Sequence, residues 1–217
     1  MNKNLTELVF ILDRSGSMAG LEADTIGGFN SMIQRQKQME GEALVSTVLF
    51  SNESRVIHDR VDLRRIEPMT CREYFVGGST ALVDAIGDAI HHIGNVHKYI
   101  REEDRPEHTV FVITTDGMEN ASHRYASDQV KAMVQRQKEK YGWEFLFLGA
   151  NMDAVETAAH FGICRDRAVT FRNDAQGQAL NYEGVSRAVS SVRSSMPFAS
   201  EWKEDIEADF RSRKSGR

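Results

Sequence analysis

Two periodicities of apolar residues alternate along the chain, one typical of strands and the other of amphipathic helices. Short apolar and β-branched runs predict six strands, and the segments between them carry apolar residues at helical spacing. Strands are expected at residues 6–12, 43–51, 54–63, 108–116, 143–150 and 167–171, and helices over about 21–38, 82–93, 126–141, 153–162 and 182–192. This alternation predicts an α/β fold with a doubly wound, mostly parallel six-stranded sheet and helices on both faces.

The strand at 54–63 is the expected exception to parallel pairing. Only a very short turn separates it from the strand at 43–51, and a turn of that length makes a hairpin. The strand at 43–51 is nearly continuous in apolar and β-branched residues, which is typical of a strand covered on both faces. The more highly charged strand at 54–63 is therefore predicted to lie antiparallel at an edge of the sheet.

Length and composition are those of one domain with a short appendage. A chain of 217 residues with 41% hydrophobic content can bury a sizeable core. From about Ser194 the sequence changes to scattered aromatic residues, a run of acids and then four basic residues. We therefore divide the chain into a domain at 1–193 and a tail at 194–217, and we expect the tail to be loosely docked or disordered.

Charge and cysteine content argue against several classes of protein. Lys and Arg number 27 and Asp and Glu number 32, and the resulting net charge of -5 offers no basic surface for nucleic acid. No stretch approaches the ~20 apolar residues that a membrane-spanning helix needs, and the first apolar run is too short for a signal peptide. The two cysteines, Cys71 and Cys164, lie outside any CxxC pattern. We expect a cytoplasmic protein that binds neither nucleic acid nor membrane.

Small oxygen-bearing residues gather in three of the predicted loops. Asp13, Ser15 and Ser17 follow the first strand, Thr80 precedes the second helix, and Asp116 ends the fourth strand. Because ligands of open parallel sheets bind beyond the carboxyl ends of the strands, we expect these five side chains to converge. No histidine or thiol accompanies them, and an all-oxygen cluster suits a hard cation such as Mg²⁺.

Other polar residues show no pattern of ligands. His91, His97 and His123 lack metal-ligand spacing and are expected on the surface. Neither Cys71 nor Cys164 has a nearby histidine in a recognisable motif, so both are interpreted as buried or partly buried thiols.

The residues around the oxygen cluster resemble the von Willebrand factor A (vWA) domain with a metal-ion-dependent adhesion site (MIDAS), in its bacterial cytoplasmic form. The resemblance rests on LVFILDRSGSMAG at 8–20, GGST at 77–80 and TTDG at 114–117, and it extends over about 4–193. The family motif is Asp-x-Ser-x-Ser followed by a distant Thr and a distant Asp. The matching positions are Asp13, Ser15, Ser17, Thr80 and Asp116.

The resemblance implies a binding module and not an enzyme. In the family, two serines and the threonine hold the ion with one or both aspartates, directly or through water, and a Glu or Asp carboxylate of a partner protein fills the open position. Neutral hydroxyl ligands leave the ion electrophilic enough to attract that carboxylate. The implied ion is Mg²⁺, with Mn²⁺ and Ca²⁺ as alternatives, and the implied partners include ATPase and stress-response complexes.

Two other functions stay open at this point. A strand that ends in Asp near Mg²⁺ resembles phosphohydrolases that use an aspartyl nucleophile, which would make Asp13 catalytic. Those enzymes carry a second acid two residues later, where this chain has Ser15. The other alternative is a structural domain in which a fully enclosed ion contributes only to stability.

Overall fold

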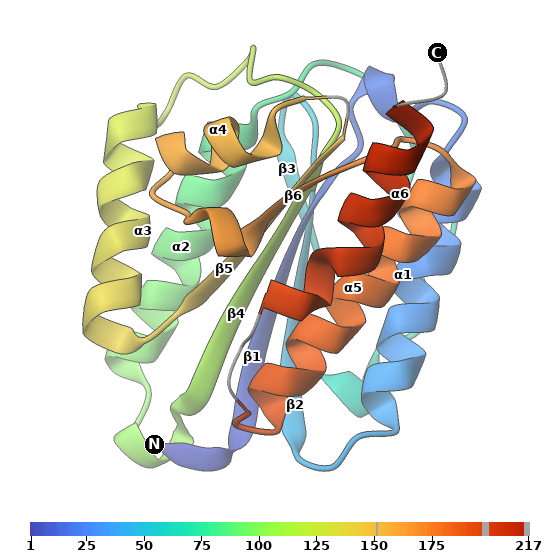
Figure 1. The fold of residues 1–217 in the computed structure, drawn as a ribbon. Helices are drawn as coiled ribbons and strands as arrows, with labels where there is room; N and C mark the ends of the chain where they lie inside the picture. The colour runs from blue at the N-terminus through green and yellow to red at the C-terminus, as the bar shows by residue number, and fades with distance from the viewer. Residues whose placement is uncertain (151, 197–199, 215–217) are drawn as a thin grey trace.

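A single mixed sheet lies between two layers of helices in the computed structural model, which describes residues 1–150, 152–196 and 200–214 (Figure 1). Over these residues the chain forms six strands and six α-helices. The strands are β1 (Asn2–Asp13), β2 (Glu42–Phe50), β3 (Ser54–Asp62), β4 (Pro106–Thr115), β5 (Glu144–Ala150) and β6 (Ala168–Phe171). The helices are α1 (Glu22–Lys37), α2 (Leu82–Tyr99), α3 (Ser127–Tyr141), α4 (Ala154–His160), α5 (Ala175–Arg193) and α6 (Glu204–Lys214).

The strand order is β3-β2-β1-β4-β5-β6, and every neighbouring pair is parallel except β2 and β3. The predicted fold class, including the antiparallel edge strand, is confirmed. From β1 the chain moves outward to β2 and β3, and it then crosses through α2 to β4 on the other side of β1. Strand order therefore reverses between β1 and β4, and a crevice for ligands is expected beyond the carboxyl ends of these two strands.

The two helical layers follow from the alternation of side chains along the strands. In β1, Leu8, Phe10 and Leu12 face one core, while Val9 and Ile11 face the other, because successive side chains of a strand point to opposite faces. Helices α1, α5 and α6 cover the first face, and α2, α3 and α4 cover the second (Figure 1). Both faces of the central strands are buried, which explains their continuous apolar runs.

The segment expected to be a loose tail is helical and docked in its described part, residues 200–214, so this expectation is corrected. Trp202 and Ile206 are 4% and 1% exposed and belong to the core beneath α5. The Trp202 indole donates a hydrogen bond to the carbonyl of Asp166, and the Lys203 ammonium donates to the carbonyl of Ala168. A division of the chain at residue 193 stays a prediction.

Two further expectations about single side chains are wrong. Cys71 and Cys164 are free and exposed instead of buried. His97 is buried instead of exposed, and its Nε2 lies 3.2 Å from Oε2 of Glu7, a fully buried residue of β1. Among the described helices, none combines the length and the apolar character that crossing a membrane would require.

Candidate metal site

The end of β1 turns back on itself and brings three predicted site residues together. The backbone N–H of Ser15 donates a 2.7 Å hydrogen bond to Oδ1 of Asp13, the last residue of the strand. A short 3₁₀ turn at Gly16–Met18 follows, and it places the Ser17 hydroxyl 3.0 Å from the Ser15 hydroxyl. Asp13, Ser15 and Ser17 therefore form one cluster of oxygen atoms at the strand end.

The end of β4 adds the fourth residue, because β4 is the neighbour of β1 in the sheet. The Thr115 hydroxyl donates a 2.6 Å hydrogen bond to Oδ2 of Asp13, and the Ser17 hydroxyl donates a 2.5 Å bond to Oδ1 of Asp116. Asp116 therefore reaches the cluster from the end of β4, whereas Asp13, Ser15 and Ser17 come from the end of the neighbouring strand β1.

Thr80 enters from the loop before α2. This loop is tied to the residue that directly follows β1 by the hydrogen bond that the Gly77 N–H donates to the Arg14 carbonyl, at 2.9 Å. Gly117, the residue after Asp116, lies very close to Thr80. A Cβ atom on Gly117 would lie 2.7 Å from the Thr80 hydroxyl oxygen and 3.4 Å from that of Ser17. The structure therefore gathers all five predicted side chains, and the close approach requires glycine at position 117.

The cluster has a buried floor and an open rim. Asp13, Ser15 and Thr80 are at most 3% exposed, whereas Ser17 is exposed and Asp116 is partly exposed. A ligand bound among these oxygen atoms would meet protein on one side and solvent on the other.

The two carboxylates of the cluster, of Asp13 and Asp116, lie in surroundings that disfavour their charged forms. Burial raises the pKa of Asp13 above its ordinary value, although hydrogen bonds from Thr115 and Ser15 oppose the rise. Burial also raises the pKa of Asp116, and the charge of Asp13 adds to that rise against the hydrogen bond from Ser17. Within the described chain, no Lys, Arg or His side chain forms an ion pair with either carboxylate.

The donor set fits a hard divalent cation. A cation among these oxygen atoms would offset both the burial and the mutual repulsion of the carboxylates. Among the described residues, no three side chains of His, Cys, Asp or Glu gather in a way that could hold a metal ion. The hydroxyl groups of Ser15, Ser17 and Thr80 are therefore the side-chain oxygen atoms that accompany the two carboxylates in this cluster.

The sequence did not reveal several residues that orient the site. The Asn173 amide donates a 2.7 Å hydrogen bond to Oδ2 of Asp116, and the buried Tyr74 hydroxyl donates a 2.6 Å bond to the Asp13 carbonyl. The Asn120 side chain accepts a hydrogen bond from the Thr80 N–H at 2.9 Å. Asn173 follows β6, so the rule that site residues follow strand ends could have identified it; Tyr74 and Asn120 give no such signal.

Two carboxylates fasten the loop after Asp116 onto the beginning of α2. Glu119 accepts hydrogen bonds from the N–H groups of Val83 and Ser122, at 2.8 and 2.7 Å. Asp84, on the first turn of α2, accepts three more from the backbone of the same loop, from residues 123–125. A negative charge near a helix N-terminus is stabilising, and here it also fixes Asp116 relative to Thr80.

No protein family model and no curated protein matches the sequence, whereas solved structures do match the fold. The von Willebrand factor type A structure from Catenulispora acidiphila is 14% identical, with a TM-score of 0.54 over 88% of this chain and 43% of that one. The chain has the fold of a von Willebrand factor A domain.

Two more vWA-type structures illustrate the range of the match. The vWF domain of the type V pili tip protein Mfa5 from Porphyromonas gingivalis is 10% identical, with a TM-score of 0.64 over 87% of this chain and 96% of that one. Proximal thread matrix protein 1 from the mussel byssus, with a zinc-occupied MIDAS motif, is 14% identical, with a TM-score of 0.60 over 87% of this chain and 46% of that one. The chain spans less than half the length of the mussel and Catenulispora chains, and at these identities the likeness shows the fold alone.

Proposed function

We propose that this chain is a metal-dependent protein-binding module whose MIDAS holds Mg²⁺ and captures an acidic side chain of a partner protein. The ligands are assigned to Asp13, Ser15, Ser17, Thr80 and Asp116. The observation that carries the proposal is the convergence of three hydroxyls and two carboxylates beyond the ends of β1 and β4. Mn²⁺ and Ca²⁺ accept the same oxygen donors, and the mussel structure with zinc at its MIDAS supports a divalent ion in this fold.

The open rim supports capture of a partner instead of a purely structural ion. When bound, the ion supplies a positive centre that a carboxylate can approach from solvent, past Ser17 and Asp116. Hydroxyl ligands are neutral, so the ion would keep most of its attraction for that carboxylate. The alternative of a purely structural ion requires the ion to be enclosed by protein on all sides. The exposed Ser17 fits that alternative less well.

The surface beside the site has the character of a protein contact. Phe75 and Met118 are 50% and 78% exposed, and they lie on the two loops that carry Thr80 and Asp116. The guanidinium of Arg14 lies 4.7 Å from the centre of the Phe75 ring. Apolar side chains with an arginine beside them suit a partner that presents an acidic residue within an apolar surface.

The environment of Asp13 argues against the phosphohydrolase alternative. Both carboxylate oxygens accept hydrogen bonds, from the Ser15 N–H and the Thr115 hydroxyl, and the residue is 2% exposed. Ser15 also stands where such an enzyme has its second acid. Asp13 is held as an anchored ligand, and a substrate phosphate would have no free access to it.

We assign the module to the cytoplasm, where the resemblance implies ATPase or stress-response complexes as partners. The two exposed, unpaired thiols, Cys71 and Cys164, fit a reducing compartment.

Melting curves with and without Mg²⁺ test the metal site. At a hundredfold excess over Kd, a bound ion stabilises the fold by about 2.7 kcal/mol, which raises Tm of a chain of this size by about 5 to 10 °C. Thr80→Val removes one hydroxyl and keeps the side-chain shape, so it should remove most of the increase. Thr109→Val, at a buried threonine elsewhere on β4, should retain it. Equal melting curves for the wild type with Mg²⁺ and with chelator would contradict the site.

Affinity capture from the native host tests the partner. Wild-type bait with Mg²⁺ should retain proteins that are lost from Thr80→Val bait and from wild-type bait in chelator. In a captured partner, replacing one surface Glu or Asp by its amide should then abolish binding. Retention of the same proteins under all three conditions would rule out metal-dependent capture.

A further inference from the structure

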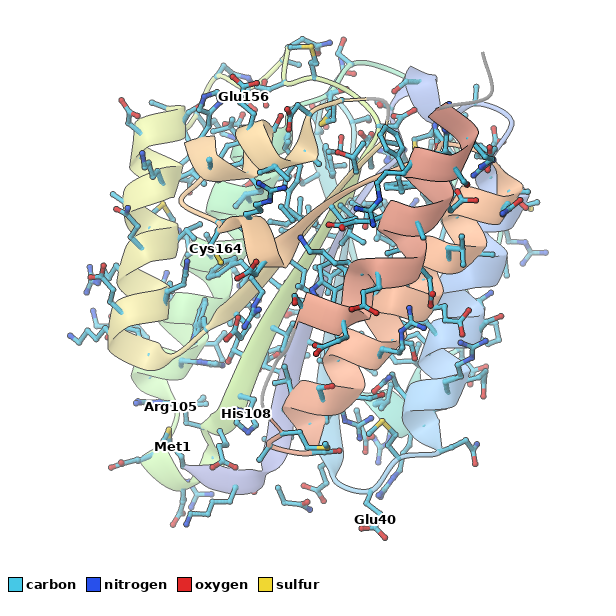
Figure 2. All side chains as sticks on the ribbon, viewed as in Figure 1. Met1, Glu40, Arg105, His108, Glu156 and Cys164 are labelled. Carbon is cyan, nitrogen blue, oxygen red and sulfur yellow. The ribbon has the colours of Figure 1, made fainter. Side chains whose placement is uncertain are left out.

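A second candidate site lies at the end of the sheet opposite the metal site. A cavity of about 400 Å³ opens between α2 and α3, and Arg105 and Trp143, which precede β4 and β5, line it. Figure 2 labels Arg105 near the lower end of the molecule, where these strands begin. Cavities that bind small molecules start at about 300 Å³, so this one is large enough for a ligand the size of a substituted ring.

The charge of this cavity is opposite to that of the whole chain. Lys98, Arg105 and Arg136 line it, and no Asp or Glu among the described residues does, although the chain carries a net charge of -5. The imidazoles of His91 and His97 and the amide of Asn95 add to its polar lining on the α2 side. Such a concentration of positive charge attracts anions.

Two buried atoms in the lining have no hydrogen-bond partner among the described residues. They are Nε of Arg105 and Oε1 of Gln137. Buried polar groups are nearly always paired, so an orphan donor and an orphan acceptor in one cavity indicate a missing partner. The planar guanidinium of arginine matches the geometry of phosphate and carboxylate groups.

Much of the remaining lining is apolar. Ile90, Met133 and the indole of Trp143 form this apolar wall, and the Trp143 ring is stacked on Phe111 with centroids 5.2 Å apart. The His97 ring packs edge-on against Trp143, with ring centroids 5.4 Å apart, and its Nε2 forms a hydrogen bond with Oε2 of Glu7. These contacts fix the wall in place, and a rigid aromatic wall suits a planar ligand.

We propose that this cavity binds a small aromatic anion, a ring that carries a phosphate or carboxylate group. Arg105 and Arg136 bind the anionic group, and the ring packs against Met133 and Trp143. Oε1 of Gln137 is an acceptor, so it accepts a hydrogen bond from a donor group, such as a hydroxyl or amino group, elsewhere on the ligand. Water alone would satisfy Arg105 and Gln137 separately, but it would account for neither the three cations nor the apolar wall.

The two tryptophans provide a direct readout. Trp143 lines the cavity, whereas Trp202 lies in the core on the other face of the sheet. The indole N–H signals of ¹⁵N-labelled, metal-free full-length protein are followed by NMR during titration with phenyl phosphate, benzoate, inorganic phosphate and benzyl alcohol, and Trp202→Phe assigns the two signals. Absence of divalent metal keeps the anions from binding at the MIDAS. Phenyl phosphate or benzoate, whichever binds more tightly, identifies the anionic group.

The expected result is a saturable shift of the Trp143 signal with an aromatic anion, while Trp202 stays unchanged. Arg105→Gln should weaken binding about tenfold, as expected for the loss of one charged hydrogen bond. Gly94→Leu should abolish binding without removing charge, because a side chain there extends from the cavity wall and only Gln137 lies near its Cβ position. Arg72→Gln, at an exposed arginine outside the cavity, should have no effect.

Three results would overturn the proposal. One is the absence of any Trp143 shift at millimolar phenyl phosphate and benzoate. Another is equal binding of inorganic phosphate or benzyl alcohol, which would mean that charge or the ring alone explains the effect. The third is full binding by Gly94→Leu, which would place the ligand outside the cavity.

Discussion

The Ser17 hydroxyl donates a hydrogen bond to Oδ1 of Asp116, 99 residues later in the chain. The other carboxylate oxygen of Asp116 accepts a hydrogen bond from the Asn173 amide. Side chains from the ends of β1 and β6 therefore fix both oxygens of a residue at the end of β4. Asp116 is oriented before any ion arrives, which lowers the cost of building a metal site.

Asn173→Ala should weaken metal binding by about tenfold or more, the usual effect of removing a group that orients a metal ligand. The fold should be retained, because Asn173 lies at the partly exposed rim. Isothermal titration with Mg²⁺ and Mn²⁺ measures the affinity. Gln176→Ala, at an exposed neighbour on α5 that bonds to Asp209 instead, serves as the control. Equal affinities for wild type and Asn173→Ala would show that Asp116 needs no such support.

Asp84 should stabilise the fold in a pH-dependent manner. Burial pushes its pKa upward, but hydrogen bonds from the N–H groups of His123, Tyr125 and Arg124, with the charge of Arg124, hold it below the ordinary value. A lowered folded-state pKa means that the stabilisation is present above the unfolded-state pKa, about 3.9, and is lost as the pH falls through the folded-state pKa. Asp84→Asn should therefore cost about 1 to 3 kcal/mol at neutral pH, and the cost should shrink below about pH 4.

Urea denaturation at a series of pH values measures this difference. Asp88→Asn is the matched control, because Asp88 lies one turn further along α2 and pairs with Arg124 at the exposed surface. Such a pair contributes about 1 kcal/mol or less. A cost for Asp84→Asn that stays constant down to the lowest pH would show that the charge of Asp84 is not what holds the loop.

Phe75 and Met118 should contribute to partner binding without affecting the metal. Each change to Ser should lower Mg²⁺-dependent capture of a partner about tenfold, the usual effect of truncating an apolar residue central to an interface. The Mg²⁺-induced rise in Tm should be unchanged, because neither side chain is a ligand. Tyr99→Ser, at a 76% exposed residue that ends α2, removes comparable apolar surface far from the site and should bind normally. If Met118→Ser lost the Mg²⁺-induced rise in Tm, Met118 would contribute to metal binding, and the separation of partner binding from metal binding would be wrong.

The fold and the site residues were readable from sequence because both follow from local patterns. Five apolar runs mark strands that are buried on one or both faces, whereas the charged edge strand β3 follows from the short turn after β2. Oxygen donors that end or directly follow such a run must lie at the carboxyl end of that strand. His97 could not be placed in this way. Its burial depends on two contacts. The ring forms a hydrogen bond with Glu7, which lies 90 positions away in the chain, and it packs against Trp143.

The docked C-terminal segment was missed for a related reason. Charged residues surround Trp202 and Ile206, so the apolar pattern of 200–214 is weak. The segment is held by the face of α5 around Gly184. Because glycine has no side chain, Trp202 and Ile206 can approach the helix closely there. A contact of this kind leaves no periodic signal in either segment.

Gly184→Ala tests that contact. A Cβ at position 184 would lie 2.7 Å from Cδ1 of Ile206 and 2.8 Å from the carbonyl oxygen of Trp202, so the backbone near Trp202 would have to move. Overpacking of this kind should lower the free energy of unfolding by about 1 to 3 kcal/mol, measured by urea denaturation. Gly27→Ala makes the same change in α1, where no described atom outside the adjoining backbone of the helix lies within 4 Å of the added carbon. It should stabilise by about 0.5 to 1 kcal/mol through helix propensity. Stabilisation by both substitutions would mean that 200–214 does not dock against α5 in solution.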